Sequence, residues 1–410
     1  MSESPNDVLD WLVIGGGIHG VHASVALLTQ AQVPRARLRI LDPQPGLLAR
    51  WRRCTANVAM QFLRSPSVHH LDVPAFSLAQ FAGFPKGETD KRFAPPYHRP
   101  SLGLFNAHCD ALIEAHELGE LHLRGAALDI EPGPDFVRVQ TSLGELRARR
   151  ILLAIGAGDQ PAWPAWAQEL REQGVAIDHV FAQGFAAEEL PDWNHAVVVG
   201  GGISAVQLAM RLGARRPGAV TLLTRGPLRE AQFDSDPGWL GPLELHGFAK
   251  LEDPVARRRA ITGARHRGSS PRDVLLALRR ARRAKRVIVR EGEVVRARFD
   301  RSLGPELWLR EGEAVHADQI VLATGFSPQR PGPWLDPLIA RAELACAPCG
   351  FPIVDQELRW HPRIHVSGPL AELELGPAAR NIAGARMAAQ RILRSLGIIV
   401  KPIARRVEVA

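Results

Sequence analysis

The sequence lacks several features that would place it in particular protein classes. Its 410 residues contain no apolar run of the roughly 18 residues that a membrane-spanning helix needs. Its first ten residues, MSESPNDVLD, are polar and acidic, whereas a secretory signal begins with basic residues followed by an apolar stretch. We therefore expect a cytoplasmic protein with no membrane partner.

Cysteine is scarce, and its spacing argues against a structural zinc site. Cys346 and Cys349 form one C-x-x-C pair among only four cysteines, and no second pair or matching histidine pair accompanies it. His69 and His70 also lack a third ligand at suitable spacing, so we predict no metal site. The C-x-x-C pair could be a redox dithiol, but it lies in a proline-rich connector rather than at a helix start, where the thiol pKa would be lowered.

Positive charge is in excess, with 51 Lys and Arg against 43 Asp and Glu and a formal net charge of +8. Such an excess can indicate nucleic-acid binding. No zinc-finger spacing, basic zipper or aromatic RNA-binding strand supports that function, so we expect no nucleic-acid partner. The arginine-rich stretch at 257–290 is interpreted as a solvated helix face, with attraction of an anionic dinucleotide as the alternative.

A glycine-rich turn near the N-terminus gives the first positive signal. A short apolar strand (11–14) runs into a G-x-G-x-x-G turn, and an Ala/Leu-rich helix (21–30) leaves it. The glycines of this pattern allow a tight turn, the approach of a pyrophosphate and close packing of helix on strand. The next strand (37–41) ends in an acid, which would bind a ribose hydroxyl. The residues expected to contact this dinucleotide are Gly15, Gly17, Gly20 and Asp42.

The same pattern returns about 185 residues later. A strand (196–199) enters a G-x-G-x-x-A turn, and a helix (206–213) and another strand (219–223) follow. The tip of that last strand carries an arginine instead of an acid, which suits the 2′-phosphate of NADPH. We therefore predict FAD at the first turn and NADPH at the second. The residues expected to contact NADPH are Gly200, Gly202, Ser204 and Arg225.

These repeats predict an α/β fold with two Rossmann-like dinucleotide-binding domains, the NADPH domain being inserted in the FAD domain. A hydrophobic content of 46% is ordinary for a globular protein, and the length suffices for more than one core. A Pro/Trp-rich linker at 160–166 marks the first boundary. We predict the first part of an FAD-binding domain at 1–160, an NADPH-binding domain at 161–330 and the C-terminal part of the FAD-binding domain at 331–410.

Two later segments complete the expected cofactor sites. Residues 317–326 predict a buried strand running into an A-T-G turn, and residues 363–367 predict another strand. A helix is expected from 376 to about 396, with Pro377 in its first turn as a start signal. Its positive end could face the electron-rich side of a reduced flavin, or the helix could serve packing alone. The residues expected to contact cofactor here are Thr324, Gly325 and Gly368.

Together these features resemble the flavoproteins with two dinucleotide-binding domains, and among them the class B flavin monooxygenases. The match is to the branch of lysine and ornithine N-hydroxylases. Residues 318–331 fit that branch's D-x3-(L/F)-ATGY-x4-(H/P) pattern, with Phe326 in place of Tyr. Trp51 and residues 60–64 resemble its W…MQ-x-SFLKDL segment. Residues 174–185 resemble its F-x-G-x3-H-x3-(Y/F) fingerprint loosely.

The resemblance implies roles for individual residues and a mechanism. In the family's segment the glutamine lies by the flavin and the basic residue contacts cofactor or substrate, which implies catalytic positions for Gln61 and Arg64 and a cofactor contact for Trp51. The implied mechanism has NADPH reduce FAD, which then forms a C4a-hydroperoxide with O2. The oxygen passes to a small nucleophilic amine. The first turn and the FLRSP segment at 62–66 depart from the family's pattern, so the amine is not specified.

Two other functions remain open from the sequence. An NADPH-dependent flavin oxidoreductase would pass electrons to a quinone, a disulfide or a protein, and the C-x-x-C pair at 346–349 is its best feature. A non-catalytic nucleic-acid protein would rest on the stretch at 257–290 alone. The sequence does not determine the oligomeric state.

Overall fold

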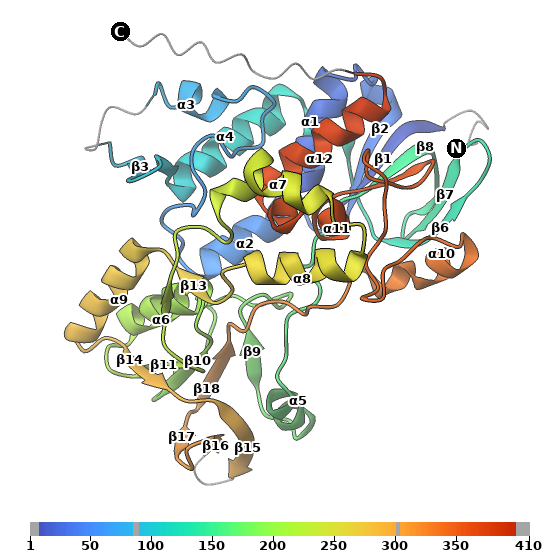
Figure 1. The fold of residues 1–410 in the computed structure, drawn as a ribbon. Coiled ribbons are helices and arrows are strands. Elements are labelled where there is room, and N and C mark those ends of the chain that lie inside the picture. The colour runs from blue at the N-terminus through green and yellow to red at the C-terminus, as the bar shows by residue number, and fades with distance from the viewer. Residues whose placement is uncertain (1–7, 85–89, 301–303, 399–410) are drawn as a thin grey trace.

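The computed structural model describes residues 8–84, 90–300 and 304–398 (Figure 1). These residues form a mixed α/β fold with parallel sheets. The helices of the described chain are α1 (Ile18–Thr29), α2 (Ala49–Asn57), α3 (Ser77–Phe81), α4 (Leu102–Ala115), α5 (Ala165–Glu172), α6 (Ile203–Arg215), α7 (Pro242–Ala249), α8 (Pro254–Ala264), α9 (Arg272–Arg283), α10 (Asp336–Arg341), α11 (Glu372–Leu375) and α12 (Ile382–Ser395).

The first sheet has the strand order β19-β20-β8-β1-β2-β5, and β6 joins it through β7. Strands β20, β8, β1, β2 and β5 run parallel to one another, whereas β19 pairs antiparallel with β20 and the first half of β8 pairs antiparallel with β7. The strands are β1 (Leu9–Ile14), β2 (Leu38–Asp42), β5 (His122–Arg124), β6 (Ala127–Pro132), β7 (Val137–Thr141), β8 (Gly144–Leu153), β19 (Arg359–His361) and β20 (Ile364–Val366).

The second sheet is parallel throughout, in the order β14-β11-β10-β18-β9. Its strands are short apolar runs, as expected for a parallel sheet covered on both faces. The strands are β9 (Ile177–His179), β10 (Ala196–Val199), β11 (Val220–Thr224), β14 (Ile288–Glu291) and β18 (Gln319–Leu322). The smaller sheets are β3 (Phe93–Ala94) with β4 (Arg99–Pro100), β12 (Arg229–Glu230) with β13 (Ser269–Ser270), and β15 (Val294–Asp300) with β16 (Gly304–Leu309) and β17 (Ala314–His316).

All strands of the second sheet lie, in sequence, between two strands of the first sheet. The chain leaves the first sheet after β8, forms every strand of the second between β9 and β18, and returns to the first at β19. Figure 1 shows the two sheets apart, with β1, β2 and β8 in the upper part and β10, β11 and β14 in the lower part.

The core lies on both faces of the first sheet. Along β1, Leu12 and Ile14 belong to one buried cluster, and Trp11 and Val13 belong to the other. This alternation follows from the two-residue period of a strand. Helices α1 and α12 pack against each other. No helix in the described part of the chain is long and apolar enough to cross a membrane.

The start of the C-terminal helix differs from the prediction. Residues Pro377–Arg380 form a 3-10 helix, Asn381 is extended with φ −89° and ψ 170°, and α12 begins only at Ile382. The extended residue interrupts the chain of helical hydrogen bonds, so a helix running on from 376 is wrong.

Candidate functional site

The first glycine turn connects β1 to α1, and its glycines have different surroundings. A Cβ on Gly15, which has φ +117°, would lie 2.3 Å from the carbonyl oxygen of Ala154. A Cβ on Gly20 would lie 1.7 Å from the carbonyl oxygen of Gly15. A Cβ on Gly17 would have no heavy atom within 4 Å. The fold itself therefore requires Gly15 and Gly20, whereas the backbone at Gly17 is open to an approaching ligand.

Asp42 lies beside this turn at the end of β2. Its carboxylate accepts hydrogen bonds from the backbone N–H of Gly16 at 2.6 Å and of Gln44 at 2.8 Å. These bonds hold the acid next to the turn, where the sequence places it. Its bond to a ribose hydroxyl stays a prediction.

His19 joins the first turn to the end of β20. Its Nδ1 lies 2.7 Å from the hydroxyl of Ser367, and a Cβ on Gly368 would lie 3.8 Å from its ring. Burial lowers the pKa of His19 to about 4, so the imidazole is neutral near pH 7. The structure thus places Gly368 beside the first turn, in contact with His19. His19 is not among the predicted site residues.

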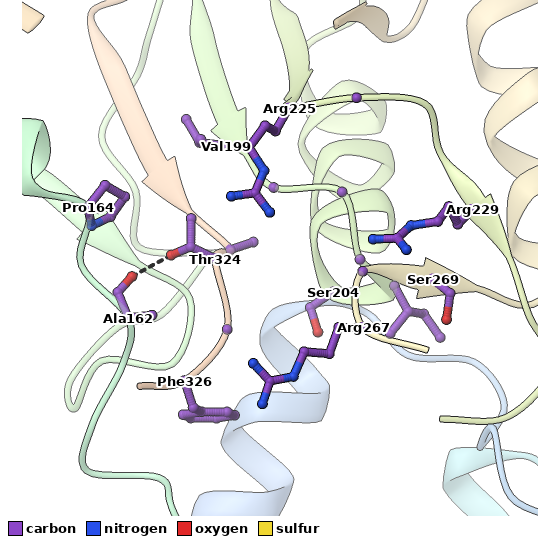
Figure 2. Close-up of a pocket in the computed structure, with 18 of the residues that line it drawn as sticks. Ala162, Pro164, Val199, Ser204, Arg225, Arg229, Arg267, Ser269, Thr324 and Phe326 are labelled. Atoms are coloured by element: carbon purple, nitrogen blue, oxygen red, sulfur yellow. Dashed lines mark hydrogen bonds between the residues drawn. The ribbon is translucent and has the colours of Figure 1, made fainter. Parts of the chain in front are cut away.

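The second glycine turn opens onto a cavity of about 1010 Å³, which we call the turn cavity (Figure 2). Gly200, with φ +150°, leaves no room for a side chain, because a Cβ would lie 2.5 Å from the carbonyl oxygen of Ala323. Six predicted cofactor residues line this cavity, and they come from β10, α6, β11 and the segment after β18. They are Gly200, Gly202, Ser204, Arg225, Thr324 and Gly325.

Three exposed arginines also line the turn cavity. Arg225 follows β11, Arg229 lies in β12 and Arg267 follows α8 (Figure 2). No ion pair to any of them is found within the described part of the chain. Only Arg225 was predicted. Arg267 belongs to the basic stretch at 257–290. It lies in the loop between the helices α8 and α9, and this loop lines the cavity.

The hydroxyl of Thr324 has partners inside the protein. It donates to the carbonyl oxygen of Ala162 at 2.6 Å (Figure 2) and lies 3.2 Å from Nε2 of His179. Burial lowers the pKa of His179 to about 4. Nearby, the rings of Phe181 and Phe326 stack with centroids 4.5 Å apart. These contacts fasten the A-T-G segment to the linker that precedes β10.

A second cavity of about 500 Å³, which we call the apolar cavity, adjoins the first. Trp51 lines it and donates from Nε1 to Oδ1 of Asn106 at 3.3 Å. The beginning of α12 also lines it, so the positive end of that helix faces this cavity. The remaining wall is largely apolar and includes Ile18, Met60, Leu63, Tyr97, Phe233 and Leu240.

The two predicted catalytic residues differ in position. Gln61 is exposed, is absent from the lining of both cavities, and its backbone carbonyl accepts from the N–H of Leu102. Arg64 borders both cavities. Its guanidinium donates to the carbonyl oxygens of residues 231–233 and to the hydroxyl of Ser269, each at 2.8 Å. Arg64 therefore ties the first part of the chain to the second at the junction of the cavities.

Two further charged residues lie at this junction, whereas Asp318 lies away from it. Asp234 and Arg380 also border both cavities, and neither is among the predicted site residues. Asp318 lies at the opposite end of its strand, where it accepts from the N–H groups of Asn194 and His195. Asp318 therefore serves the fold there.

The cysteines lie outside both cavities. Cys346 is half-buried, Cys349 is exposed, and both are free thiols. Burial raises the pKa of Cys346, which makes it a weaker nucleophile near pH 7. Within residues 8–84, 90–300 and 304–398 no group of three His, Cys, Asp or Glu side chains could hold a metal ion.

Comparison with known proteins identifies a class of fold. No protein-family model matches the sequence, and no curated protein matches it. By structure, the chain has the mixed α/β fold with parallel sheets that occurs in FAD-dependent monooxygenases.

Three solved structures illustrate the similarity. The cadaverine monooxygenase of desferrioxamine biosynthesis from Erwinia amylovora, bound to FAD, has a TM-score of 0.74 and 17% identity over 98% of both chains. The ornithine N-hydroxylase of Kutzneria sp. 744, with reduced FAD, NADP+ and L-ornithine, has a TM-score of 0.74 and 18% identity over 95% of this chain and 99% of its own. The bacillithiol disulfide reductase of Bacillus cereus has a TM-score of 0.58 and 16% identity over 95% and 98%.

Proposed function

We propose that this protein is an FAD-dependent, NADPH-using monooxygenase that oxygenates a small nucleophilic amine. One observation carries the proposal. Two glycine turns, each at the carboxyl end of a parallel strand, lie in one chain; the second lines the turn cavity, and the first reaches the apolar cavity through Ile18. The fold similarity to an amine monooxygenase bound to FAD and to an ornithine N-hydroxylase with FAD and NADP+ supports the same function.

The first sheet suits FAD, and the second suits NADPH. Gly17 leaves room for a pyrophosphate, Asp42 lies ready for a ribose, and the apolar cavity offers a slot for a flat ring system. At the second turn, Arg225 and its two neighbouring arginines supply the positive charge that a 2′-phosphate needs. We accordingly assign residues 1–160 and 331–410 to the FAD-binding domain and 161–330 to the NADPH-binding domain, both Rossmann-like.

Bound FAD would supply the chemistry by accepting a hydride from NADPH and activating O2 for transfer to the amine nitrogen. The protein itself would position the cofactors and the substrate and would exclude water from them. Trp51, Met60 and Leu63 form part of the wall of the apolar cavity, where they would exclude water from a bound ring. Arg64 holds the loop at 231–233 against this wall. The N–H groups at the start of α12 would stabilise negative charge on the reduced ring.

The decisive experiment follows the flavin spectrum after NADPH-reduced protein is mixed with O2. We expect a transient spectrum distinct from those of reduced and oxidised flavin, with a longer lifetime when NADP+ is present. We also expect NADPH consumption to match the hydroxylated amine formed from the best substrate in an amine screen. Direct return to oxidised flavin, with and without NADP+, would contradict the proposal.

An NADPH-dependent flavin oxidoreductase is the second candidate, because a disulfide reductase shares the fold. The position of Cys346 and Cys349 outside both cavities disfavours a dithiol form of this function. Rapid anaerobic turnover with quinone acceptors, unaffected when both cysteines are replaced by serine, would favour electron transfer that does not use the dithiol.

A further inference from the structure

We propose that Cys346 and Cys349 form a site of reversible oxidation by hydrogen peroxide, which closes a disulfide between them and acts on the two cavities through Arg258 and Glu372. The inference goes beyond the proposed function and rests on it only for the source of the peroxide. At a flavin that finds no amine, NADPH, H+ and O2 give NADP+ and H2O2. The observations are the turn that carries the cysteines, their unequal exposure and the contacts of Arg258.

The two cysteines lie in a loop that folds back on itself. The N–H of Gly350 donates to the carbonyl oxygen of Ala347 at 2.7 Å, and the N–H of Ala347 donates to the carbonyl oxygen of Phe351 at 2.8 Å. The two thiols are close enough to interact, since burial is the main cause of the raised pKa of Cys346 and negative charge on Cys349 adds to it. The turn thus holds two free thiols side by side.

The two thiols differ in the part that each can take. Cys349 is exposed and open to a small oxidant, whereas Cys346 is half-buried. Burial raises the pKa of Cys346, so Cys346 is the weaker nucleophile toward peroxide and suits the second step, in which it attacks an oxidised neighbour. The pair therefore has the order of a peroxide-sensitive thiol followed by a resolving thiol.

Arg258 of α8 lies beside Cys349. Burial lowers the pKa of Arg258, but Glu372 and then Cys349 raise it above its usual value. Its Nε and Nη2 are buried and have no hydrogen-bond partner among the described residues. A guanidinium with free donors stabilises negative charge on a neighbouring sulfur or on an oxygen bound to that sulfur. Arg258 is therefore placed to favour oxidation at Cys349.

The reaction needs no partner besides peroxide. The Cys349 sulfur attacks one oxygen of H2O2, the O–O bond breaks, and the other oxygen leaves as water after taking a proton. The sulfur, oxidised by two electrons, is then a sulfenic acid. The Cys346 sulfur attacks it, the S–S bond forms, and the sulfenic hydroxyl leaves with the Cys346 proton as a second water. Two thiols and one H2O2 thus give one disulfide and two waters.

A chain of contacts connects this loop to the cavities. Phe351, in the same turn, lies with its ring centre 4.0 Å from the Arg258 guanidinium and belongs to a buried cluster with residues of α7, α8 and α11. Arg258 donates to the carboxylate of Glu372. Arg380, which borders both cavities, donates to the same carboxylate at 2.6 and 2.9 Å. A disulfide that reshapes the turn would therefore move Arg258 and disturb Arg380.

The first test locates the disulfide without turnover. FAD-loaded protein with reduced thiols is treated with H2O2, the remaining thiols are alkylated, and the cysteines are assigned by peptide mass spectrometry. We expect a bond between Cys346 and Cys349 at peroxide concentrations that leave Cys54 and Cys109 reduced. Cys54 is the matched internal control, because it is also partly buried and has arginines beside it.

Variants separate the two steps. Cys346→Ser should stop at a sulfenic acid on Cys349, which a dimedone probe labels. Arg258→Gln should slow disulfide formation by at least about 10-fold, whereas Arg258→Lys, which keeps the charge, should slow it less. Equal rates in wild type, Arg258→Gln and Arg258→Lys would remove Arg258 from the proposal.

The second test measures the effect on the site. We expect the disulfide form to oxidise NADPH at least about 5-fold more slowly than the reduced form, with recovery in dithiothreitol. The double variant Cys346→Ser/Cys349→Ser should match the reduced wild type and ignore peroxide. Absence of the disulfide, or equal oxidation of Cys54, overturns the site, and an unchanged rate in the disulfide form overturns its action on the cavities. Because the peroxide is added, the disulfide forms or fails to form whether or not the flavin spectra support a monooxygenase.

Discussion

At the scale of single residues, the glycines of the first turn divide into those that the fold needs and one that a ligand needs. Gly15 and Gly20 have no space for a Cβ, because carbonyl oxygens lie where it would be placed. Gly17 has φ −81° and open space around its missing side chain. The three glycines of one motif therefore have separable roles, which can be measured separately.

We predict opposite outcomes for two alanine substitutions. Gly20→Ala should lower the free energy of unfolding by about 3 kcal/mol or more, because the new Cβ would overlap the carbonyl oxygen of Gly15. Gly17→Ala should leave the stability of the apoprotein within about 0.5 kcal/mol and weaken FAD binding at least about 10-fold. Urea unfolding and fluorescence titration with FAD measure the two effects. Equal loss of stability in both variants would contradict this division.

Arg225 allows a prediction about the nicotinamide cofactor. Arg225→Gln should raise the KM for NADPH by about 10- to 100-fold and leave the KM for NADH unchanged, because only NADPH carries the 2′-phosphate. Arg216→Gln is the control, since Arg216 is exposed and does not line the turn cavity. Steady-state oxidation of both cofactors is the measurement, and equal effects on NADPH and NADH would argue against the contact.

At the scale of elements, the segment between Arg64 and α3 is held by buried neutral histidines. His22 of α1 lies with Nδ1 2.8 Å from the carbonyl oxygen of Leu71, and the ring of His70 packs at 5.3 Å from that of His108 on α4. Burial lowers the pKa of His22 to about 3 and the pKa values of His69 and His70 to about 4. The rings are therefore uncharged near pH 7, and their protonation would oppose docking of the segment.

This arrangement predicts acid sensitivity. Below about pH 6.5 the unfolded chain takes up protons at these histidines, whereas the folded chain does not do so until about pH 4. Stability is therefore complete above pH 6.5 and falls as the pH falls toward 4, by up to about 1 kcal/mol per pH unit for each histidine. Urea unfolding between pH 7.5 and 4.5 measures the slope. His70→Gln should reduce it, and replacement of the exposed His98 by Gln should not.

At the scale of the whole molecule, several polar side chains connect the part of the chain that forms the first sheet with the part that forms the second. Asn57 at the end of α2 donates to the carbonyl oxygen of Phe185 at 2.8 Å and accepts from the N–H of Ala187 at 3.0 Å. Arg64 makes another of these bridges, to residues 231–233. Both bridges lie in the stretch between the first nucleotide turn and α4.

We predict that Asn57→Ala lowers the free energy of unfolding by about 2–4 kcal/mol, because it leaves a buried carbonyl and a buried N–H without partners. Asn194→Ala is the control, since the Asn194 side chain is exposed and only its backbone N–H is bonded. Chemical unfolding provides the measurement. A change below about 0.5 kcal/mol in Asn57→Ala would show that the bridge contributes little.

The sequence by itself determined the features that depend on neighbours along the chain. Both glycine turns and the strands before them are found where the sequence places them, because turn chemistry and apolar runs are local signals. The break before α12 was missed, although Asn381 stands at the N-cap of the helix and Asn is a favoured N-cap residue. The assignments of cofactors and of catalytic residues remain predictions.

Only the tertiary structure decided which side chains share a cavity. Arg229, Arg267 and Arg380 come from three separate segments, and nothing in their spacing relates them to one another or to Gly200. Tertiary packing also placed Arg64 at the junction and Gln61 outside both cavities, although the two residues are close in sequence. A glycine motif determines the conformation of its own turn, because the residues involved are adjacent in sequence. A site assembled from distant loops depends on how the two sheets pack, and that packing is a property of the whole chain.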